Sequence, residues 1–393
     1  MPATIRVPGP AHHSRLATLD SRLATESAFA VAAQVRALRA AGRSIADLSI
    51  GEPDLPTADC IVEAGARALR DGATRYTAPA GLPALRAAVA DDLNRAAEPP
   101  SRRAAEDVFI TPGAKPALLY ALLATVGPGD EVLVPDPGFS PYISQVRLAG
   151  GVPVACPAGC EADRITTRTR AIILNSPANP DGTALGLTEL IAVAALAQRH
   201  DLVIISDEIY ARIWFGEGRR APGISQLPGL EQRTIIVDGF SKAWRMTGWR
   251  LGHAVVPPYL RTTFERLAVN AHSCVPGFIQ HAGVAALEAG DQLVREYVEQ
   301  LRTRRDSLVA ALNALPGVEC ATPQGAFYAF PDFDRDDVQL QQQLLETAGI
   351  ATLAGSTFGS RGAGHVRLSF AAAPRELDRA VNLLTSHFSL LTS

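Results

Sequence analysis

Short apolar segments alternate with longer amphipathic ones over much of this chain, from about residue 46 to residue 256. The apolar segments have the length of strands, and we expect them at Asp107–Thr111, Glu131–Pro135, Val152–Cys156, Ala171–Asn175, Leu202–Ser206, Thr234–Asp238 and His253–Val256. Helical spacing fills the intervals, for example at Ala114–Thr125 and Leu187–His200. Apolar strands that alternate with helices are typical of a mostly parallel sheet covered on both faces. The pattern therefore predicts an α/β fold with a seven-stranded sheet flanked by helices.

The rest of the chain has a different pattern. Residues 26–41 are Ala-rich with helical spacing, and Gly42 is a typical helix end. A long helical pattern covers about 283–313, and the tail combines strands with helices at 325–330, 337–348, 364–370 and 374–388. This mixture predicts a second, smaller α+β domain. We expect three parts: an N-terminal arm with part of the small domain (1–45), a large domain (46–285) and a small C-terminal domain (286–393).

Composition narrows the possible partners and locations. A chain of 393 residues exceeds one ordinary core, so two or more domains are expected. The net charge of −3 gives no electrostatic reason to expect nucleic acid or an anionic membrane as a partner. No apolar run reaches the length of a membrane span, and the N-terminus lacks the apolar core of a signal peptide. We therefore expect a cytoplasmic protein.

The cysteines agree with a reducing compartment. Five cysteines in so long a chain do not make a disulfide scaffold. Cys156 and Cys160 are close together, but no second Cys/His pair follows at zinc-finger spacing. Free thiols and no bound metal are the expectation.

Polar motifs follow several of the predicted strands, where ligands bind in sheets of this kind. Asp207 comes directly after one strand, in Ser-Asp-Glu-Ile-Tyr, and Asn179 follows another, in Ser-Pro-Ala-Asn-Pro-Asp-Gly. Gly113 opens a helix, and helix N-termini bind phosphate through unpaired N–H groups. Each motif alone has an ordinary alternative: Asp207 as a helix cap or surface acid, and the Asn-Pro segment as a turn.

The run from 241 to 252 reads Ser-Lys-Ala-Trp-Arg-Met-Thr-Gly-Trp-Arg-Leu-Gly and contains Lys242. Alone, Lys242 would be interpreted as a surface residue, since lysine is seldom buried unless paired. The run resembles the lysine segment of the class I/II aminotransferases, which are fold-type I enzymes that use pyridoxal phosphate (PLP). The resemblance covers nearly the whole chain after about residue 14, with its motifs in the family's order from 51 to 371.

The resemblance implies a role for each motif around the cofactor ring. Lys242 would hold PLP as a Schiff base. Asp207 would face the ring nitrogen and keep it protonated, best with its pKa held low by that cation. Asn179 and Tyr210 would donate hydrogen bonds to the 3′ oxygen, and Phe139 would stack on the ring.

The resemblance also implies a phosphate site and a shared active site. The residues that it assigns to the phosphate are Gly113, Ala114, Lys115, Ser241 and Arg250. An arginine fork matches a phosphate well. Tyr76 resembles the tyrosine that reaches the phosphate of the neighbouring subunit, which would make the protein a homodimer. Read without the resemblance, Tyr76 is an ordinary aromatic loop anchor.

The substrate carboxylate has its own candidates. Arg367, in Gly-His-Val-Arg-Leu-Ser-Phe-Ala, resembles the arginine that clamps the α-carboxylate, and a bidentate pair fixes both place and orientation. Gly51 resembles the glycine whose backbone meets the same carboxylate, next to Asn179, on a segment expected to close over the substrate. The chain departs from the family at Asp181, where threonine is usual, and at His253, where an aromatic residue is common.

The resemblance implies ping-pong transamination from an L-amino acid to a 2-oxo acid, with the freed Lys242 as general base. A PLP-dependent lyase of the C–S β-lyase type shares every cofactor residue and stays an alternative. A PLP-sensing regulator would need a DNA-binding domain, for which no basic segment exists. A plain α/β binding protein would not need Lys242 together with Asp207.

The only indication of the substrate's side chain is that the predicted site shows no second cation for a distal carboxylate. Acidic substrates need a second cation, and the helix Pro116–Thr125 is apolar apart from Tyr120. This favours a neutral or aromatic amino donor, although Arg15 and Arg22 of the arm, or the partner subunit, could supply a charge. The resemblance implies 2-oxoglutarate or pyruvate as acceptor.

Overall fold

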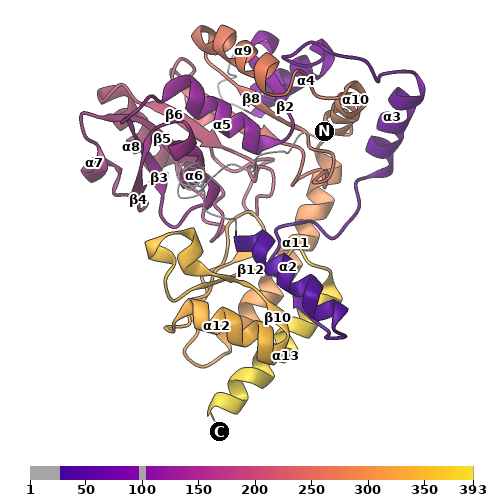
Figure 1. Cartoon of the computed structure of the whole chain (residues 1–393), viewed down its shortest axis with the longest axis vertical. Helices are drawn as coiled ribbons and strands as arrows, with labels where there is room; N and C mark the ends of the chain where they lie inside the picture. Colours follow the sequence, from indigo (N-terminus) through magenta and orange to yellow (C-terminus); the bar gives the residue numbers. More distant parts are fainter. Residues whose placement is uncertain (1–26, 97–102, 393) are drawn as a thin grey trace, which may run out of the picture.

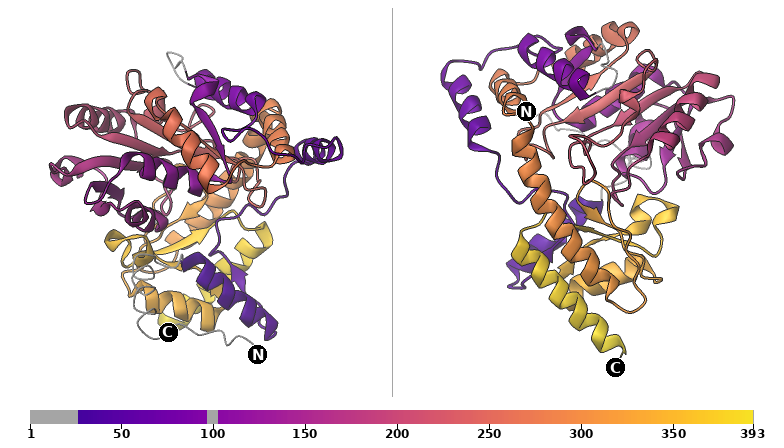
Figure 2. Two further views of the ribbon diagram at one scale, coloured as in Figure 1. Left: turned by 45° about the horizontal axis from the view of Figure 1, so that its top comes forward. Right: turned by 180° about the vertical axis from the view of Figure 1, so that it is seen from behind.

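The computed structural model describes residues 27–96 and 103–392. The predicted arm at 1–25, with Arg15 and Arg22, lies outside the described residues. Figure 1 shows two bodies: a larger one built around a sheet, and a smaller one that contains α2 and α13. The long helix α11 (Asp291–Asn313) runs from the larger body into the smaller one and packs beside α13 there (Figure 2).

The larger body contains the predicted seven-stranded sheet. Its strands are β2 Val108–Thr111, β3 Glu131–Pro135, β4 Val152–Cys156, β5 Thr169–Asn175, β6 Val203–Asp207, β7 Thr234–Gly239 and β8 Gly252–Val255. Their order is β2-β8-β7-β6-β5-β3-β4, and β8 runs antiparallel to both of its neighbours while the other pairs are parallel. The mostly parallel α/β sheet is therefore confirmed, with each expected strand present.

Helices cover both faces of this sheet, as the alternation along β5 shows. Ala171 and Ile173 pack into a core with α5 and α6, whereas Ile172 and Leu174 pack on the other face with α8. Successive side chains of a strand point to opposite faces, so a strand buried on both sides is apolar throughout. The helices of this body are α3 Asp59–Arg70, α4 Pro83–Ala96, α5 Ala114–Thr125, α6 Pro141–Leu148, α7 Glu161–Arg164, α8 Leu187–Arg199, α9 Arg261–Ala271 and α10 Gly277–Glu288.

The smaller body is a mixture of helices and short strands. Its further elements are α2 Ser27–Ala40, β1 Ala46–Asp47, β9 Tyr328–Ala329, α12 Asp337–Gln343, β10 Ile350–Ala351, β11 Leu353–Ala354, β12 Val366–Ser369 and α13 Pro374–Thr392. β1 pairs in parallel with β10, and β11, β12 and β9 form an antiparallel sheet. Short 3-10 turns complete the chain at Ala105–Asp107, Ile224–Gln226, Pro258–Leu260, Gly355–Phe358 and Ser360–Gly362, and a π-helical turn at Leu344–Ala348.

Two of the differences from the sequence-based expectation have their cause in the backbone. The helical pattern at 283–313 is interrupted, because Gly290 has a φ of 75° and separates α10 from α11. The strand expected at 325–330 shortens to β9, because Ala326 has a φ of 56°, which extended backbone does not allow. Both breaks are backbone conformations that hydrophobic periodicity does not report.

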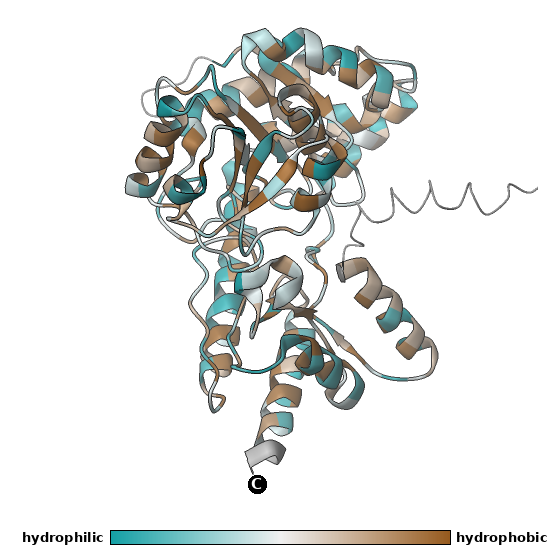
Figure 3. Ribbon diagram, turned by 60° about the vertical axis from the view of Figure 1, so that its left-hand side comes forward, coloured by the Kyte–Doolittle hydropathy of each residue, from teal (hydrophilic) through white to brown (hydrophobic). Residues whose placement is uncertain are grey.

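The strands of the larger sheet are the most continuously apolar part of the molecule, while the outer helices mix apolar and polar residues (Figure 3). Among the described residues, no helix combines the length and apolar content that crossing a bilayer requires. Nor does that part of the chain bring together three His, Cys, Asp or Glu side chains that could hold a metal ion. All five cysteines are free thiols.

Candidate active site

The carboxyl ends of β5 and β6 bring the first candidates together. Asn175 and Asp207 end these strands and are partners in register. The Asn175 side chain donates to the Asp207 carbonyl oxygen at 3.1 Å and accepts from the Asn179 amide at 2.9 Å. The sheet therefore fixes Asn179 beside Asp207. Asn175 had no role in the sequence interpretation, although its place at a strand end was visible.

The Asp207 carboxylate is buried and bonded by one side chain. The Tyr142 hydroxyl donates to its Oδ2 at 2.7 Å, and the Ile209 amide lies 3.3 Å from Oδ1. Burial raises the pKa of Asp207 to about 6, while these two hydrogen bonds lower it. A cation facing the carboxylate would bring the pKa back down. Sequence reasoning missed Tyr142, which lies one helical turn after Phe139.

Lys242 points into the molecule. Its Nζ donates to the Gly51 carbonyl oxygen at 2.6 Å and lies 5.8 Å and 5.5 Å from the ring centres of Tyr210 and Phe327. A Cβ on Gly51 would lie 1.8 Å from the Tyr328 hydroxyl, so glycine is required at that position. The structure thus brings together two candidates separated by nearly 200 residues.

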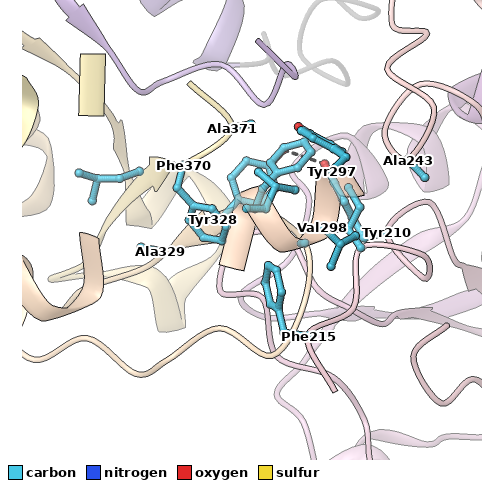
Figure 4. Close-up of a cluster of buried hydrophobic side chains, with 14 of the residues drawn as sticks. Tyr210, Phe215, Ala243, Tyr297, Val298, Tyr328, Ala329, Phe370 and Ala371 are labelled. Atoms are coloured by element: carbon cyan, nitrogen blue, oxygen red, sulfur yellow. Dashed lines mark hydrogen bonds between the residues drawn. The ribbon is translucent and has the colours of Figure 1, made fainter. Parts of the chain in front are cut away.

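Tyr210 lies in a buried aromatic cluster that joins the two bodies. Its hydroxyl is 2.7 Å from the hydroxyl of Tyr328, and its ring meets that of Phe327 edge to face. Figure 4 shows Tyr210 and Tyr328 in this cluster, together with Phe215 and Phe370. Sequence reasoning assigned no role to Tyr328 or Phe327, because their segment resembles an ordinary buried strand.

Arg367, on β12, is only 4% exposed. Its guanidinium donates to the Asn179 side-chain oxygen at 2.8 Å and to the Ser49 carbonyl at 2.6 Å. The guanidinium carbon also lies 4.2 Å from the ring centre of Tyr328 and 5.0 Å from that of Phe358. A buried cation with these neighbours is held in a fixed orientation, which suits a carboxylate ligand.

The start of α5 meets the loop after Lys242. Gly113 has a φ of 96°, and a Cβ there would lie 2.4 Å from Nη2 of Arg250. Arg250 is held by a hydrogen bond from Nη1 to the Thr247 carbonyl at 2.7 Å. Ala114 begins the helix, and Ser241 is buried next to Lys242 in the sequence. The N–H groups of the helix and the guanidinium therefore converge, as an anion site requires.

The remaining residues predicted to bind the cofactor are Phe139, Lys115 and Tyr76. The Phe139 ring meets Tyr142 edge to face at 5.5 Å, and the Lys115 Nζ lies 5.3 Å from the centre of the same ring. The Lys115 Nζ also lies 5.6 Å from the ring of Phe29 on α2. Tyr76 is 91% exposed, so within one chain it does not join the buried candidates.

A buried ionic cluster lies behind Asp207. The Arg220 guanidinium contacts Glu208 at 3.2 Å and Asp238 at 3.0 Å, and it also faces Asp92 at 3.5 Å. Glu208 follows Asp207 directly, and Asp238 precedes Lys242 by four residues. One guanidinium thus joins the ends of β6 and β7.

His253, the departure noted in the sequence, is fully buried on β8 opposite Asp238. Burial, and then the charge of Arg220, lowers the pKa of His253 to about 3. Its imidazole is therefore neutral at physiological pH.

Comparison with known proteins identifies the family of this chain. Residues 43–384 match the family model for aminotransferase class I and II. A putative aminotransferase of Bacillus subtilis is 37% identical over 358 residues, covering 88% of this chain and 92% of the relative. An aspartate aminotransferase of Musicola paradisiaca is 36% identical, covering 92% and 93%.

Comparison with a solved structure gives the same family. The aromatic aminotransferase from Pyrococcus horikoshii superposes with a TM-score of 0.84 at 34% identity, covering 90% of this chain and 98% of that one. Because the superposition covers 90% of this chain, the similarity includes both bodies of the molecule and not only the large sheet. The chain therefore belongs to the class I and II aminotransferases, and it is a fold-type I, PLP-dependent transaminase.

Proposed function

We propose that this transaminase moves an amino group from an L-amino acid to a 2-oxo acid by a ping-pong mechanism. The observation that carries the proposal is a continuous line of hydrogen bonds from Asp207 through Asn175 and Asn179 to Arg367. It links the backbone carbonyl of the residue whose carboxylate would face the cofactor ring to the guanidinium that would bind the substrate. Two half-reactions at one site need such a fixed relation between cofactor and substrate.

The residues present fit PLP at both of its ends. Asp207 is a buried carboxylate that a cation would stabilise, and a protonated ring nitrogen is such a cation. Gly113 and Arg250 approach so closely that no side chain fits between them, which suits a phosphate. When bound, PLP supplies an electron sink for bond changes at the α-carbon. The residues that would hold it are Lys242, Asp207, Tyr210, Asn179, Phe139, Gly113, Ala114, Lys115, Ser241 and Arg250, with the partner subunit's Tyr76.

Four residues would handle the substrate. Arg367 binds its α-carboxylate as a bidentate pair, with Asn179 and the backbone of Gly51 beside it. Lys242 is the general base that removes the proton from the α-carbon. Its Nζ already lies 2.6 Å from the Gly51 carbonyl, which supports a position next to the bound carboxylate.

The amino donor that we propose is a neutral or aromatic L-amino acid. The walls near Arg367 include the rings of Tyr328 and Phe358. Such a surface favours an apolar side chain.

Aspartate is the second candidate donor. Lys115 places an ammonium group over Phe139, and the relative from Musicola paradisiaca is named an aspartate aminotransferase. Because Lys115 is also a candidate for the phosphate site, a Lys115→Met variant is assayed at saturating PLP: a role in side-chain selection would lower kcat/KM for aspartate by tenfold or more relative to that for phenylalanine. Equal effects on both donors would exclude a role for Lys115 in side-chain selection.

The deciding experiment is a half-reaction screen. Holoenzyme is mixed with single L-amino acids in the absence of any oxo acid, and the cofactor absorption and the products are followed together. Conversion of the cofactor with one equivalent of 2-oxo acid would support ping-pong transamination and identify the donor. Repeated turnover that releases pyruvate with ammonia or a thiol, with the cofactor unchanged, would favour the C–S β-lyase alternative.

We further propose a homodimer with shared active sites. An exposed tyrosine in the loop between α3 and α4 supports it, because Tyr76 points to solvent and not into the buried site of its own chain. Light scattering would give the oligomeric state. Mixing Lys242→Ala and Tyr76→Phe subunits would test sharing, since each hybrid dimer regains one site with both native residues.

The domain division and the location are proposals of the same kind. We assign about 46–285 to the PLP-binding domain and 286–393 to the small domain, with the N-terminal 45 residues divided between the arm and the small domain. Because β1 pairs with β10, the first boundary is better drawn just after Asp47. The five free cysteines support a cytoplasmic location, which cell fractionation would test.

A further inference from the structure

Tyr328 contacts three parts of the active site at once. It lies on β9 opposite Ser369 of β12, and it is 2% exposed. Its hydroxyl meets the hydroxyl of Tyr210, its ring lies under the guanidinium of Arg367, and the same hydroxyl is the group that leaves no room for a Cβ on Gly51.

The hydroxyl pair has one consequence for proton placement. The two hydroxyl oxygens are 2.7 Å apart, and either of them can be the donor. A hydroxyl carries a single proton, so if Tyr210 donates to the cofactor's 3′ oxygen, Tyr328 must donate to the oxygen of Tyr210. A hydroxyl that accepts one hydrogen bond becomes a stronger donor in the next.

The ring makes a separate contact. The guanidinium carbon of Arg367 lies 4.2 Å from the ring centre of Tyr328, which is within the range of a cation–π interaction. This contact needs the ring and not the hydroxyl. The charged and titratable groups around the Tyr210–Tyr328 pair are Lys242, Arg367, Asp207, Tyr142 and, from α11, Tyr297.

We propose that Tyr328 is a positioning residue that acts through two neighbours: its hydroxyl strengthens the hydrogen bond that Tyr210 gives to the 3′ oxygen of PLP, and its ring orients Arg367 for the substrate carboxylate. This inference rests on the proposed function, which assigns those roles to Tyr210 and Arg367. The hydroxyl of Tyr328 would then affect the pKa of the linkage between Lys242 and the cofactor, and its ring would affect KM for the amino donor.

The expected direction of each effect follows from the chemistry. The linkage between Lys242 and the cofactor loses its proton more easily when a hydrogen bond stabilises the negative charge left on the 3′ oxygen. Weakening the bond from Tyr210 therefore raises the pKa of that linkage. Loss of the ring weakens the support of Arg367 and raises KM for the amino donor.

The experiment compares Tyr328→Phe with Tyr328→Leu in the holoenzyme. The pKa of the linkage is read from the absorption spectrum during a pH titration, and kcat and KM are measured for one amino donor. Tyr328→Phe is expected to raise the pKa by roughly 0.5 unit with KM within about twofold of the native value. Tyr328→Leu is expected to raise the pKa similarly and KM by about tenfold.

Tyr297→Phe is the matched control. Tyr297 belongs to the same buried cluster, and its hydroxyl has no hydrogen-bond partner among the described residues (Figure 4). Removing that hydroxyl should change neither the pKa of the linkage nor KM. A pKa rise in this control equal to that in Tyr328→Phe would overturn the inference, because any buried hydroxyl would then have the same effect.

A double variant tests whether Tyr328 acts through Tyr210. In a Tyr210→Phe background, Tyr328→Phe should shift the pKa no further, because the hydroxyl that it supports is gone. Additive shifts, or a native pKa in Tyr328→Phe with normal amino transfer, would overturn the inference and leave the proposed function intact. A native protein without any absorption that depends on Lys242 would overturn both.

Discussion

The Nζ of Lys242 donates a hydrogen bond to the carbonyl oxygen of Gly51 at 2.6 Å. The segment that carries Gly51 is anchored three residues later, where Asp54 forms a two-pronged ion pair with Arg304 of α11 at 2.7 Å and 3.1 Å. The lysine that would carry the cofactor is thus in direct contact with a segment tied to the long helix that joins the two bodies. A substitution at Lys242 therefore removes a hydrogen bond from the segment of Gly51, which would meet the substrate carboxylate.

The chain contains only two lysines, Lys115 and Lys242, and both are site candidates. We expect borohydride reduction of the holoenzyme to fix the cofactor on Lys242 alone, because only its Nζ lies beside Tyr210. Peptide mapping by mass spectrometry reads the position, with Lys115 as an internal control. Label on Lys115 would show that the cofactor site has been assigned to the wrong lysine.

Asp207 should make cofactor binding depend on pH. Burial raises the pKa of Asp207 from 3.8 to about 6, so its contribution to the stability of the apoprotein is present below pH 4 and is lost as pH rises through 6. One pKa unit corresponds to about 1.4 kcal/mol. A facing cation removes this loss, so the rise in melting temperature on adding PLP should be larger at pH 7 than at pH 5.

Asp207→Asn is the control for that titration. The amide does not titrate, so the variant should lose the part of the pH dependence that comes from residue 207, while the ionisations of PLP itself remain. The same difference between pH 5 and pH 7 in native protein and variant would rule Asp207 out as the titrating group.

Arg367→Lys should weaken substrate binding and leave the cofactor in place. Lysine keeps the charge but loses the planar fork that donates to Asn179 and Ser49 in the native site. We expect kcat/KM to fall on the order of 100-fold, equivalent to about 2.7 kcal/mol. PLP affinity, measured by spectral titration, should stay within a few-fold. The exposed Arg361→Lys serves as the control and should change neither quantity.

Gly113→Ala should weaken PLP binding through crowding at the phosphate. Gly113 and Gly72 both have positive φ, at 96° and 87°, so alanine strains the backbone at either position. Only at Gly113 would the new methyl group lie 2.4 Å from Nη2 of Arg250, whereas nothing lies within 4 Å at Gly72. We expect the dissociation constant for PLP to rise tenfold or more in Gly113→Ala only. Equal rises in both variants would point to backbone strain instead.

Arg220→Met should be strongly destabilising. The guanidinium is 3% exposed and neutralises Glu208 and Asp238, so its removal leaves buried carboxylates without their partner. Breaking a buried pair in this way costs about 3–5 kcal/mol. Arg70→Met removes an exposed pair with Glu63 and should cost at most about 0.5 kcal/mol. Urea unfolding of the two variants gives the comparison, and similar midpoints would refute the buried cluster as a source of stability.

The sequence was sufficient for the elements and for most of the candidate residues. Strands such as Glu131–Pro135 and the helix Ala114–Thr125 have the bounds expected from periodicity, because burial of a strand or a helix face is recorded locally in the alternation of apolar residues. Lys242, Asp207 and Arg367 were found because each stands in a contiguous run.

Tyr142, Asn175 and Tyr328 could be recognised only in the folded chain. Each forms a hydrogen bond with Asp207 or Tyr210, and the bonded residues are 65, 32 and 118 positions apart in the sequence. For the two tyrosines the local sequence gives no signal, because a buried tyrosine has the same local pattern whether or not its hydroxyl meets an active-site group. The ionic cluster at Arg220 was hidden for the same reason.

The sequence by itself determined where most of the helices and strands run, and which residues are candidates for the chemistry of a PLP enzyme. The tertiary structure alone decided which of them touch: that Arg367 meets Asn179 across 188 residues, and that the segment of Gly51 closes on Lys242. Periodicity and motifs depend on residues that are neighbours in the sequence. Strand register and the packing of the two bodies depend on the whole chain, and it is this register and packing that bring the site residues together.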